Sequence, residues 1–219
     1  MPDGAIEGLA SFVERLLEQN KVMNLTGITE PFEVVDRHIL DSATVLPFLP
    51  DRSCTLVDVG TGGGFPGVPL KFLRPDLDVT LLDGLAKRLD WLEETTADLG
   101  LHGITTLHGR GEEVAHDHEY RESFDVATAR GVAELRILAE ICLPLVKVGG
   151  VFLAQKGRDC AHEIEGASDI IEKVGGAQAE LVPISGGETA IVVIRKISKT
   201  PDNYPRRWAS ITRAPKKKS

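Results

Sequence analysis

A glycine-rich segment between Asp58 and Gly67 has the residue types and spacing of a nucleotide-cofactor loop. It follows a short apolar run and contains alternating glycines, which let the backbone take positive φ and come close to a ligand. The GxGxG glycines are Gly60, Gly62 and Gly64. Pro66 suits the first turn of a helix, where free N–H groups face the ligand. The segment therefore predicts a strand, a ligand-binding turn and a helix.

Two acidic residues bear on which cofactor this loop binds. Asp83 ends the next apolar run, where a carboxylate can accept hydrogen bonds from both ribose hydroxyls. The loop also reads as GxGxxG of the NAD type through Gly62, Gly64 and Gly67, so the glycines alone do not decide. Asp58 favours S-adenosylmethionine, because its carboxylate would repel a pyrophosphate but not a sulfonium ligand with an ammonium group. A nicotinamide-dependent oxidoreductase stays the alternative.

Apolar runs that alternate with amphipathic segments must position these residues. Strands are expected at 55–59, 79–83, 104–107, 124–129 and 151–155, with a helix between the second and third that ends near Gly100. This order predicts a Rossmann-like α/β fold with a mostly parallel sheet. A helix near 163–174, a strand near 179–184, a Gly186-Gly187 turn and a strand over 189–197 predict a closing antiparallel hairpin. Such a seven-stranded arrangement is typical of class I methyltransferases.

Three regions of different character follow one another along the chain. Residues 1–50 form a helical extension with amphipathic helices over 6–17 and 32–46, residues 51–198 the Rossmann-like domain, and residues 199–219 a basic tail. The net charge of −8 conceals this tail, because Arg195–Ser219 holds nine of the 25 basic residues and a single acid. Such a tail can contact phosphates or be a solvated terminus.

Cysteine usage and hydropathy indicate the compartment. Three cysteines without CxxC spacing, Cys54, Cys142 and Cys160, indicate buried thiols in a reducing environment. We see no signal peptide and no apolar run of membrane-spanning length, so we expect a cytoplasmic protein without membrane contact. His116 and His118 look superficially like a metal tract, but they lack further ligands nearby, and we predict no metal.

The segment at the end of the fourth expected strand, Ala127–Gly131, bears on the methyl acceptor. It lacks the Asn or Asp and two prolines with which enzymes hold an exocyclic amine, and the cysteines lack an activating context for attack on cytosine. Guanine N7 has a lone pair and no proton to lose, so it needs neither device. Arg130 and Lys156 are candidates to position the target. The alternative for Arg130 is a structural salt bridge, and the alternative for Lys156 is a solvated lysine in a loop.

These motifs together resemble the RsmG (GidB) family of bacterial ribosomal RNA methyltransferases over nearly the whole chain. The most specific part is the Gly-Phe-Pro-Gly form of the loop, Gly64–Gly67. Two departures are Gly84, where the family often has serine, and Trp208–Ser219, which replaces its usual glycine- and proline-rich ending. The other matching segments are Asn20 with Asn24–Gly27, Arg37–Ser42, Asp58–Leu70, Leu82-Asp83 with Lys87-Arg88, Gly109–Glu113, Thr128–Arg130, Lys156-Gly157 and Tyr204–Arg207.

The resemblance implies a class I fold and methyl transfer from S-adenosylmethionine to N7 of one guanine in small-subunit (16S) ribosomal RNA, with S-adenosylhomocysteine as product. It implies that Gly60, Phe65 and Arg130 line the cofactor pocket, and that the ribose and adenine are held by Asp83, Gly84, Leu85, Gly111 and Glu112. The partner would be this RNA or the 30S subunit, and we expect a monomer. A non-catalytic RNA-binding module with a vestigial pocket is a further alternative.

Basic residues outside the glycine loop are candidates for contact with RNA. They are His38, Lys156, Arg206, Arg207, Lys216, Lys217 and Lys218. His38, Asp41 and Ser42 fall three and four positions apart and would share one helix face. They either form a wall of the active site or a hydrogen-bond cluster that anchors the extension to the catalytic domain.

Overall fold

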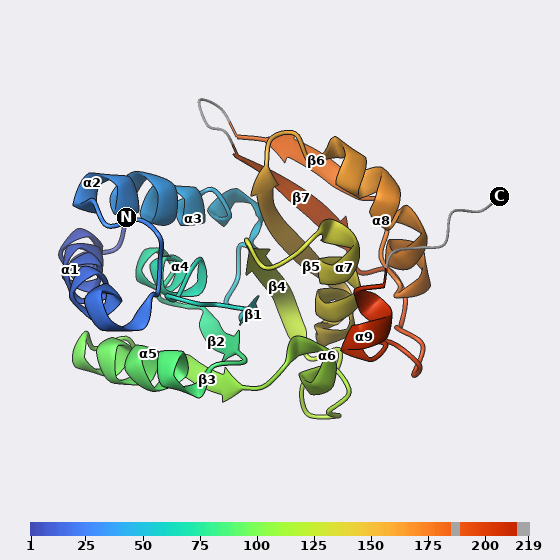
Figure 1. Cartoon of the computed structure of the whole chain (residues 1–219), viewed down its shortest axis with the longest axis horizontal. Coiled ribbons are helices and arrows are strands. Elements are labelled where there is room, and N and C mark those ends of the chain that lie inside the picture. Colours follow the sequence, from blue (N-terminus) through green and yellow to red (C-terminus); the bar gives the residue numbers. More distant parts are fainter. Residues whose placement is uncertain (185–188, 214–219) are drawn as a thin grey trace.

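A twisted sheet with helices on both faces forms the body of the protein (Figure 1). The computed structural model describes residues 1–184 and 189–213. Within these ranges the sheet has seven strands in the order β3-β2-β1-β4-β5-β7-β6. The first five run parallel, and β7 is antiparallel to both β5 and β6. The predicted class I architecture with a closing hairpin is confirmed.

The strands agree with the predicted ones to within a few residues, apart from the start of the fifth. Here Lys147 and a glycine pair interrupt the apolar run, and the register jumps from Phe124 opposite Val146 to Val126 opposite Val151. The predicted Gly186-Gly187 turn lies outside the described residues. The strands are β1 (Thr55–Val59), β2 (Asp78–Asp83), β3 (Ile104–His108), β4 (Phe124–Arg130), β5 (Val146–Gly157), β6 (Glu180–Pro183) and β7 (Thr189–Arg195).

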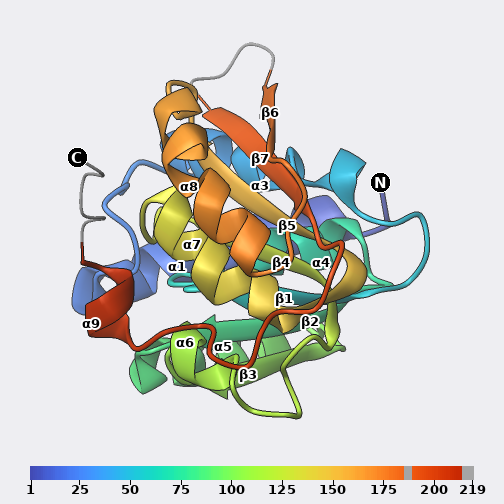
Figure 2. The same ribbon diagram turned by 90° about the vertical axis from the view of Figure 1, so that its right-hand side faces the viewer.

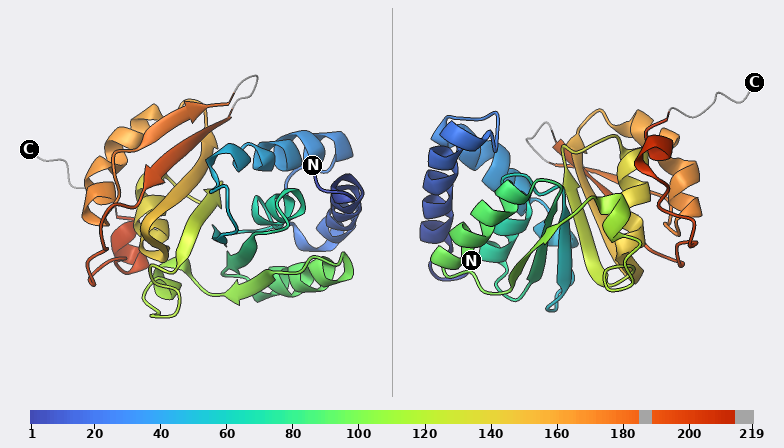
Figure 3. Two further views of the ribbon diagram at one scale, coloured as in Figure 1. Left: turned by 180° about the vertical axis from the view of Figure 1, so that it is seen from behind. Right: turned by 60° about the horizontal axis from the view of Figure 1, so that its bottom comes forward.

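Each face of the sheet has its own helices, as the right-hand view of Figure 3 shows. Each face also has its own hydrophobic core. One face carries α1 (Ala5–Met23), α4 (Gly67–Leu73) and α5 (Ala86–Asp98). The other carries α6 (Gly111–Val114), α7 (Leu135–Cys142), α8 (Ala161–Lys173) and α9 (Trp208–Ile211). Side chains of α1 share the first core with β1, α4 and α5, so the extension packs directly on the sheet and its helices.

The second predicted helix of the extension is present, with helical residues from Pro31 to Ala43, but it is not one regular amphipathic helix. It is divided into α2 (Pro31–Val34), a π-helical stretch (Val35–Leu40), α3 (Asp41–Ala43) and a 3-10 turn (Leu46–Phe48). The wider π turn rotates the residues after it, so no single face continues through the segment. Phe32, expected in the core, is 90% exposed, whereas Val34 is fully buried.

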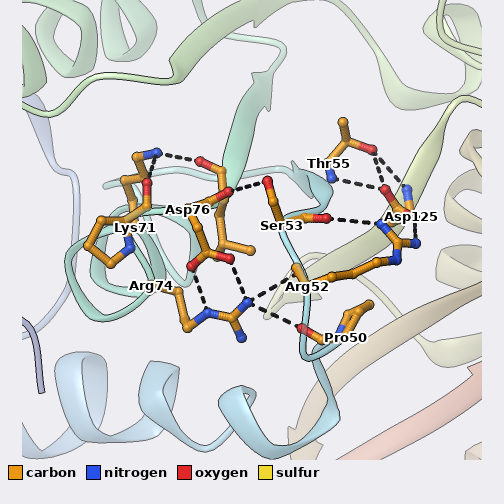
Figure 4. A network of polar contacts seen from close by, with 10 residues as sticks. Pro50, Arg52, Ser53, Thr55, Lys71, Arg74, Asp76 and Asp125 are labelled. Carbon is orange, nitrogen blue, oxygen red and sulfur yellow. Dashed lines mark hydrogen bonds and ion pairs between the residues drawn. The ribbon is translucent and has the colours of Figure 1, made fainter.

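A polar network locks the amino ends of the strands (Figure 4). Asp125 of β4 accepts hydrogen bonds from Arg52 at 2.6 Å and from the amide and hydroxyl of Thr55, both at 3.1 Å, and pairs with Lys147. Burial alone would raise the pKa of Asp125, but these partners outweigh it and hold the pKa well below its usual range. With the amino ends held in this way, the carboxyl ends are left for ligands.

Residues 199–213, which we call the C-terminal strap, fold back over α6 and α7 (Figure 2). Arg121 donates to three strap carbonyls, those of Thr200, Pro201 and Tyr204. His116 bonds the Pro205 carbonyl at 2.7 Å. The alternative of a solvated terminus is therefore wrong for the strap, although residues 214–219 lie outside the described residues.

The cysteines are buried and unpaired, as predicted. Burial raises the pKa of Cys142 well above its usual range, so this thiol is unreactive at neutral pH. In the described part of the chain, no helix has the length and apolarity to cross a membrane. Over the same residues, no group of three or more His, Cys, Asp and Glu side chains is placed to hold a metal ion.

Candidate functional site

The glycine loop joins β1 to α4 at the carboxyl edge of the sheet. Gly60, Gly62 and Gly64 have φ of +72°, +57° and +94°, a region that side-chain-bearing residues rarely adopt. A Cβ atom on Gly60 would lie 2.6 Å from Val132 Cγ2, and one on Gly64 would lie 2.9 Å from Leu92 Cδ2. The glycines therefore serve both the turn and the close packing around it.

Asp58 holds the loop from beneath. Its side chain is fully buried, and Oδ2 accepts hydrogen bonds from the Thr61 hydroxyl at 2.7 Å and the Gly67 amide at 2.9 Å. The Thr128 hydroxyl lies 3.3 Å from Oδ1. Burial raises the pKa of Asp58 to about 6, although the bonds from Thr61 and Gly67 oppose the shift. The carboxylate thus shapes the loop, and its direct contact with a cofactor stays a prediction.

Asp83 connects the loop to the next strand. It ends β2, and its Oδ2 accepts the Gly62 amide while its Oδ1 accepts the Leu85 amide, both at 2.9 Å. Arg88 lies 3.7 Å from Oδ2. The two carboxylate oxygens have lone pairs beyond these bonds. The predicted partners, the GxGxG turn and the acid of the following strand, are therefore brought together at the carboxyl edge.

Phe65 lies between the extension and the sheet. Its ring centroid is 5.7 Å from that of Phe12 and 4.6 Å from that of His38, and the Arg130 guanidinium lies over it at 5.0 Å. The side chain is only 4% exposed. Phe65 thus joins α1, the π-helical stretch and the end of β4 at one point.

The cluster of His38, Asp41 and Ser42 anchors the extension. His38 Nε2 is 2.7 Å from the Thr26 hydroxyl, and the buried Ser42 hydroxyl donates to the His38 carbonyl. Burial, with the nearby charge of Arg130, lowers the pKa of His38 to about 4, so the imidazole is neutral at pH 7. This geometry supports the anchoring alternative. A contact of His38 with RNA stays a prediction.

Arg130 and Gln155 link the sheet to Asp41. They are register partners at the ends of β4 and β5. Arg130 Nη1 donates to the Arg37 carbonyl at 3.1 Å and lies 3.4 Å from Asp41 Oδ2. Gln155 Nε2 donates to the Asp41 carbonyl at 2.8 Å and to its Oδ2 at 3.0 Å. Gln155 was not among the predicted site residues, although a polar side chain that closes an apolar strand was a signal for it.

Lys156 lies on the opposite face from Gln155 and is not a solvated loop lysine. Its side chain is 12% exposed, and Nζ pairs with Glu163 at 2.7 Å and donates to the Ala133 carbonyl at 3.0 Å. Glu163 also accepts the Leu135 amide. Lys156 therefore ties residues 133–135 to α8, while its predicted part in positioning the target or binding RNA stays a prediction.

The predicted adenine-side residues, Gly84, Leu85, Gly111 and Glu112, follow β2 and β3. A Cβ on Gly111 would lie 2.5 Å from Ile141, so glycine lets α6 pack on α7. The Arg110 side chain passes beside Gly84 and lies 3.3 Å from Glu112 Oε1. It also covers the Trp208 ring at 4.7 Å. Sequence reasoning missed this pair, which brings the strap close to the residues predicted to hold the adenine.

The predicted RNA-binding residues of the tail differ in their surroundings. Arg206 forms a double hydrogen bond to the fully buried Glu140, at 2.7 and 2.6 Å, whereas the neighbouring Arg207 is exposed. Lys216, Lys217 and Lys218 lie outside the described residues. His118 is exposed beside Asp117, consistent with a polar loop.

The sequence matches one protein family over most of its length. The family model GidB, described as rRNA small subunit methyltransferase G, matches residues 5–192. Ribosomal RNA small subunit methyltransferase G of Alkaliphilus metalliredigens is 42% identical and covers 97% of this chain and 91% of its own. The protein of the same name from Acetivibrio thermocellus is 40% identical and covers 98% and 90%.

Solved structures of methyltransferases share the fold. A SAM-dependent methyltransferase from Aquifex aeolicus superposes with a TM-score of 0.57 at 17% identity and covers 76% of this chain and 93% of its own. The 16S rRNA N2 G1207 methyltransferase of T. thermophilus, in complex with AdoMet and guanosine, gives a TM-score of 0.53 at 12% identity and covers 74% and 40%. At these identities the likeness concerns the fold.

Proposed function

This chain belongs to the rRNA small subunit methyltransferase G family, and from that membership we propose that it methylates N7 of one guanine in small-subunit ribosomal RNA with S-adenosylmethionine. The observation that carries the proposal is the junction of the glycine loop with Asp83 at the carboxyl edge of the sheet. Ligands of open α/β sheets bind at this edge. A nicotinamide-dependent oxidoreductase finds no support in the family.

The residues at this edge fit the cofactor. Asp83 has lone pairs for the ribose hydroxyls beside the Gly62 amide, and Gly62 leaves open space where a side chain would project. Gly84 and Glu112 lie beyond it for the adenine, with Arg110 alongside. Gly60, Phe65 and Arg130 are proposed to flank the methionine part. The bound cofactor supplies an electrophilic methyl group on a sulfonium centre.

The chain has to align the acceptor more than activate it. Guanine N7 attacks with a lone pair and loses no proton, so a general base is not required at this position. Arg130 ends β4 over Phe65 and is proposed to orient the base and exclude water from it. Asp58, buried under the loop, keeps the turn in the shape that this alignment needs.

The biological setting follows from the substrate. We propose that the protein acts in the cytoplasm, as a monomer, on the RNA itself or on the 30S subunit, and that methyl transfer uses no metal ion. Residues 1–50, 51–198 and 199–219 are proposed as its extension, catalytic domain and tail. Arg207 and the lysines at 216–218 are proposed to contact phosphates, because RNA affinity rests largely on such charges.

Base mapping tests the proposal directly. The protein is incubated with labelled S-adenosylmethionine and small-subunit RNA or 30S subunits from a strain that lacks this modification, and the labelled base and atom are identified. We expect label on N7 of one guanine. Label on an exocyclic nitrogen or on protein would overturn the proposal. A larger thermal shift with NADH than with S-adenosylhomocysteine would favour the oxidoreductase instead.

Asp83→Asn tests cofactor binding, with the same substitution at Asp90 as its control. The amide keeps one acceptor but loses the charge that strengthens hydrogen bonds to ribose hydroxyls. We expect the dissociation constant of S-adenosylhomocysteine to rise about tenfold or more. Asp90→Asn, an exposed change on α5, serves as the control and should leave the constant unchanged.

A further inference from the structure

Two buried oxygen atoms, Asp41 Oδ1 and Gln155 Oε1, have no hydrogen-bond partner. Over residues 1–184 and 189–213, every other buried side-chain nitrogen or oxygen has one. Buried polar groups in native proteins are nearly always paired, because leaving one unpaired is costly. Two such acceptors in adjoining side chains therefore call for a ligand that brings hydrogen-bond donors.

The surroundings fix both atoms as acceptors. Gln155 is 3% exposed, and its Nε2 donates to the Asp41 carbonyl at 2.8 Å and to Asp41 Oδ2 at 3.0 Å. The opposite amide orientation would place the Gln155 oxygen against that carbonyl oxygen, so Oε1 stays on the free side. Asp41 Oδ2 is taken by Gln155 and approached by Arg130 at 3.4 Å, which leaves Oδ1 free.

The acceptor pair lies on the target side of the proposed site. Gln155 pairs in register with Arg130 at the carboxyl end of the sheet, where ligands of this fold lie. Asp41 comes from the extension and is docked onto this edge. On the other side of β4, Asp83 and the glycine loop form the proposed cofactor site. The pair thus lies on the opposite side of β4 from the proposed cofactor site, and we assign this side to the base.

We propose that Asp41 Oδ1 and Gln155 Oε1 accept the hydrogen bonds of N1–H and the N2 amino group of the target guanine. This inference rests on the proposed function. N7 lies on the opposite edge of the purine from N1 and N2, so a base held in this way directs N7 away from the pair, toward the cofactor side. Enzymes that act on single bases commonly read them by hydrogen bonds to the Watson–Crick edge.

Two neighbouring acceptors select guanine among the four bases. Guanine alone presents two adjacent donors, N1–H and the N2 amino group, on this edge. Adenine and cytosine present an amino donor beside a ring-nitrogen acceptor, and uracil presents one N–H between two carbonyl oxygens. An acceptor that faces a buried acceptor is left unpaired, and such mismatches discriminate strongly.

Entry of the base requires the cover over the pair to open. Both oxygens are shielded from solvent in the protein alone, and Arg130 lies against the same carboxylate. Its contacts to the Arg37 carbonyl, 3.1 Å, and to Asp41 Oδ2, 3.4 Å, are the longest in the cluster and the most easily given up. Arg130 would then move off Asp41 Oδ2, so that the guanine can reach the adjoining Oδ1.

Replacement of one base in the RNA tests the proposal. Two RNAs are compared that differ only at the mapped target, which is guanosine in one and inosine in the other. Inosine keeps N7 and N1–H but lacks the N2 amino group. We expect the wild-type kcat/KM for N7 methylation to be about tenfold higher with guanosine, the effect of one hydrogen bond.

Two variants assign the acceptors. Gln155→Met removes Oε1, while Asp41→Asn puts a donor in place of Oδ1, because the amide oxygen must face Gln155 Nε2. The variant that has lost the N2 acceptor should treat the two RNAs alike to within twofold. The other should keep the preference and lose about tenfold in kcat/KM with both RNAs, since both bases carry N1–H. Gln178→Met, an exposed change, is the control and should match wild type.

The outcomes separate this inference from the function on which it rests. The inference would be overturned if the wild type methylated N7 of guanosine and inosine equally well. It would also be overturned if both variants kept the wild-type preference for guanosine and the wild-type rate. Either result would leave the proposed function standing. Absence of N7 methylation in the wild type would overturn both. Affinity for S-adenosylhomocysteine reports whether each variant is folded. If a variant does not fold, the comparison of the two RNAs with the wild-type protein still tests recognition of the N2 amino group.

Discussion

Asp58 and His38 are buried close to the glycine loop, and burial shifts their pKa values in opposite directions. The pKa of Asp58 is raised to about 6, and that of His38 is lowered to about 4. In both cases burial penalises the charged form, and for His38 the charge of Arg130 adds to the effect. Near neutral pH, Asp58 is mostly charged at a cost to folding and His38 is neutral.

The two groups should act on stability with opposite sign between pH 4 and 6. The folded protein binds the Asp58 proton more tightly than the unfolded chain, so this contribution to the free energy of unfolding is present at low pH and lost as pH rises from 3.8 through 6. Asp58→Asn lacks this titration, so its free energy of unfolding relative to wild type should rise with pH. The rise should reach up to about 3 kcal/mol, which is two pKa units at 1.36 kcal/mol each. Urea unfolding of wild type and variant at pH 4, 5 and 6 measures it.

His38→Gln provides the opposite comparison. The unfolded chain binds more protons than the folded one between pH 4 and 6.5, so the contribution of His38 rises with pH over this range. The stability of His38→Gln relative to wild type should fall as pH rises, whereas that of Asp58→Asn should rise. Parallel pH profiles for the two variants and the wild type would contradict both assignments.

Local spacing made some site residues predictable and left others out of reach. The glycine loop and Asp83 could be predicted because a turn and the end of the next strand are encoded within about one βαβ unit. The bond between Asp41 and Gln155 joins residues 114 apart and exists only after the extension has docked. A pattern of neighbours along the chain carries no information on that docking.

At the scale of elements, the C-terminal strap depends on a few buried charges. Glu140 of α7 is fully buried and accepts the Arg206 amide at 3.0 Å as well as the guanidinium. Lys196, also fully buried, donates to the hydroxyl of Thr200 in the strap and to the carbonyls of Leu143 and Val174 at 2.9 Å, and burial lowers its pKa to about 8. The strap is thereby tied to α7 and to the turn after α8.

Neighbouring arginines of the strap separate stability from RNA contact. Arg206→Ala leaves the Glu140 carboxylate buried with one amide partner, and we expect a loss of about 2 kcal/mol in the free energy of unfolding. This is below the roughly 3–5 kcal/mol typical of fully buried pairs, because the Arg206 side chain is 40% exposed. Arg207→Ala should leave stability unchanged and weaken RNA binding. Equal loss of stability in both variants, measured by urea unfolding, would contradict this division.

The second segment of the extension shows where sequence periodicity fails. Phe32, Val35, Ile39 and Leu46 fit a helical repeat, yet Phe32 is 90% exposed and Val35 is 41% exposed. A π turn adds a residue to one turn, so the buried Val34 lies five positions before the buried Ile39. Phe32 and Val35 therefore fall out of phase with this core face. Because this change is stabilised by tertiary contacts such as those of His38 and Asp41, local periodicity cannot predict it.

At the scale of the whole molecule, RNA affinity must arise on a chain of net charge −8. Three basic side chains that were predicted to contact the target or the RNA already have protein partners: Arg130, Lys156 and Arg206. The proposed phosphate contacts therefore fall largely on Arg207 and the lysines at 216–218. A small number of such contacts makes the affinity sensitive to each of them.

Substitution of Lys216, Lys217 and Lys218 by alanine tests whether these lysines provide the phosphate contacts. Each phosphate contact adds about 0.7 to the slope of log K against log salt for single-stranded RNA, so the slope should fall by up to about 2. Alanine at Arg15, Lys21 and Lys173, three exposed residues outside the tail, removes the same charge elsewhere and should change the slope little. Fluorescence anisotropy of a labelled RNA across salt concentrations measures both. Equal slopes in the two triple variants would refute a special part for the tail.

The position of Phe65 has a kinetic consequence. The rings of Phe12 and His38 and the guanidinium of Arg130 that surround it come from far apart along the chain. Contacts between distant segments require costly loop closure and form late in folding. The helices, whose contacts are local, can therefore form before the glycine turn has acquired its final surroundings. In refolding experiments, recovery of S-adenosylhomocysteine binding should then lag behind recovery of secondary structure.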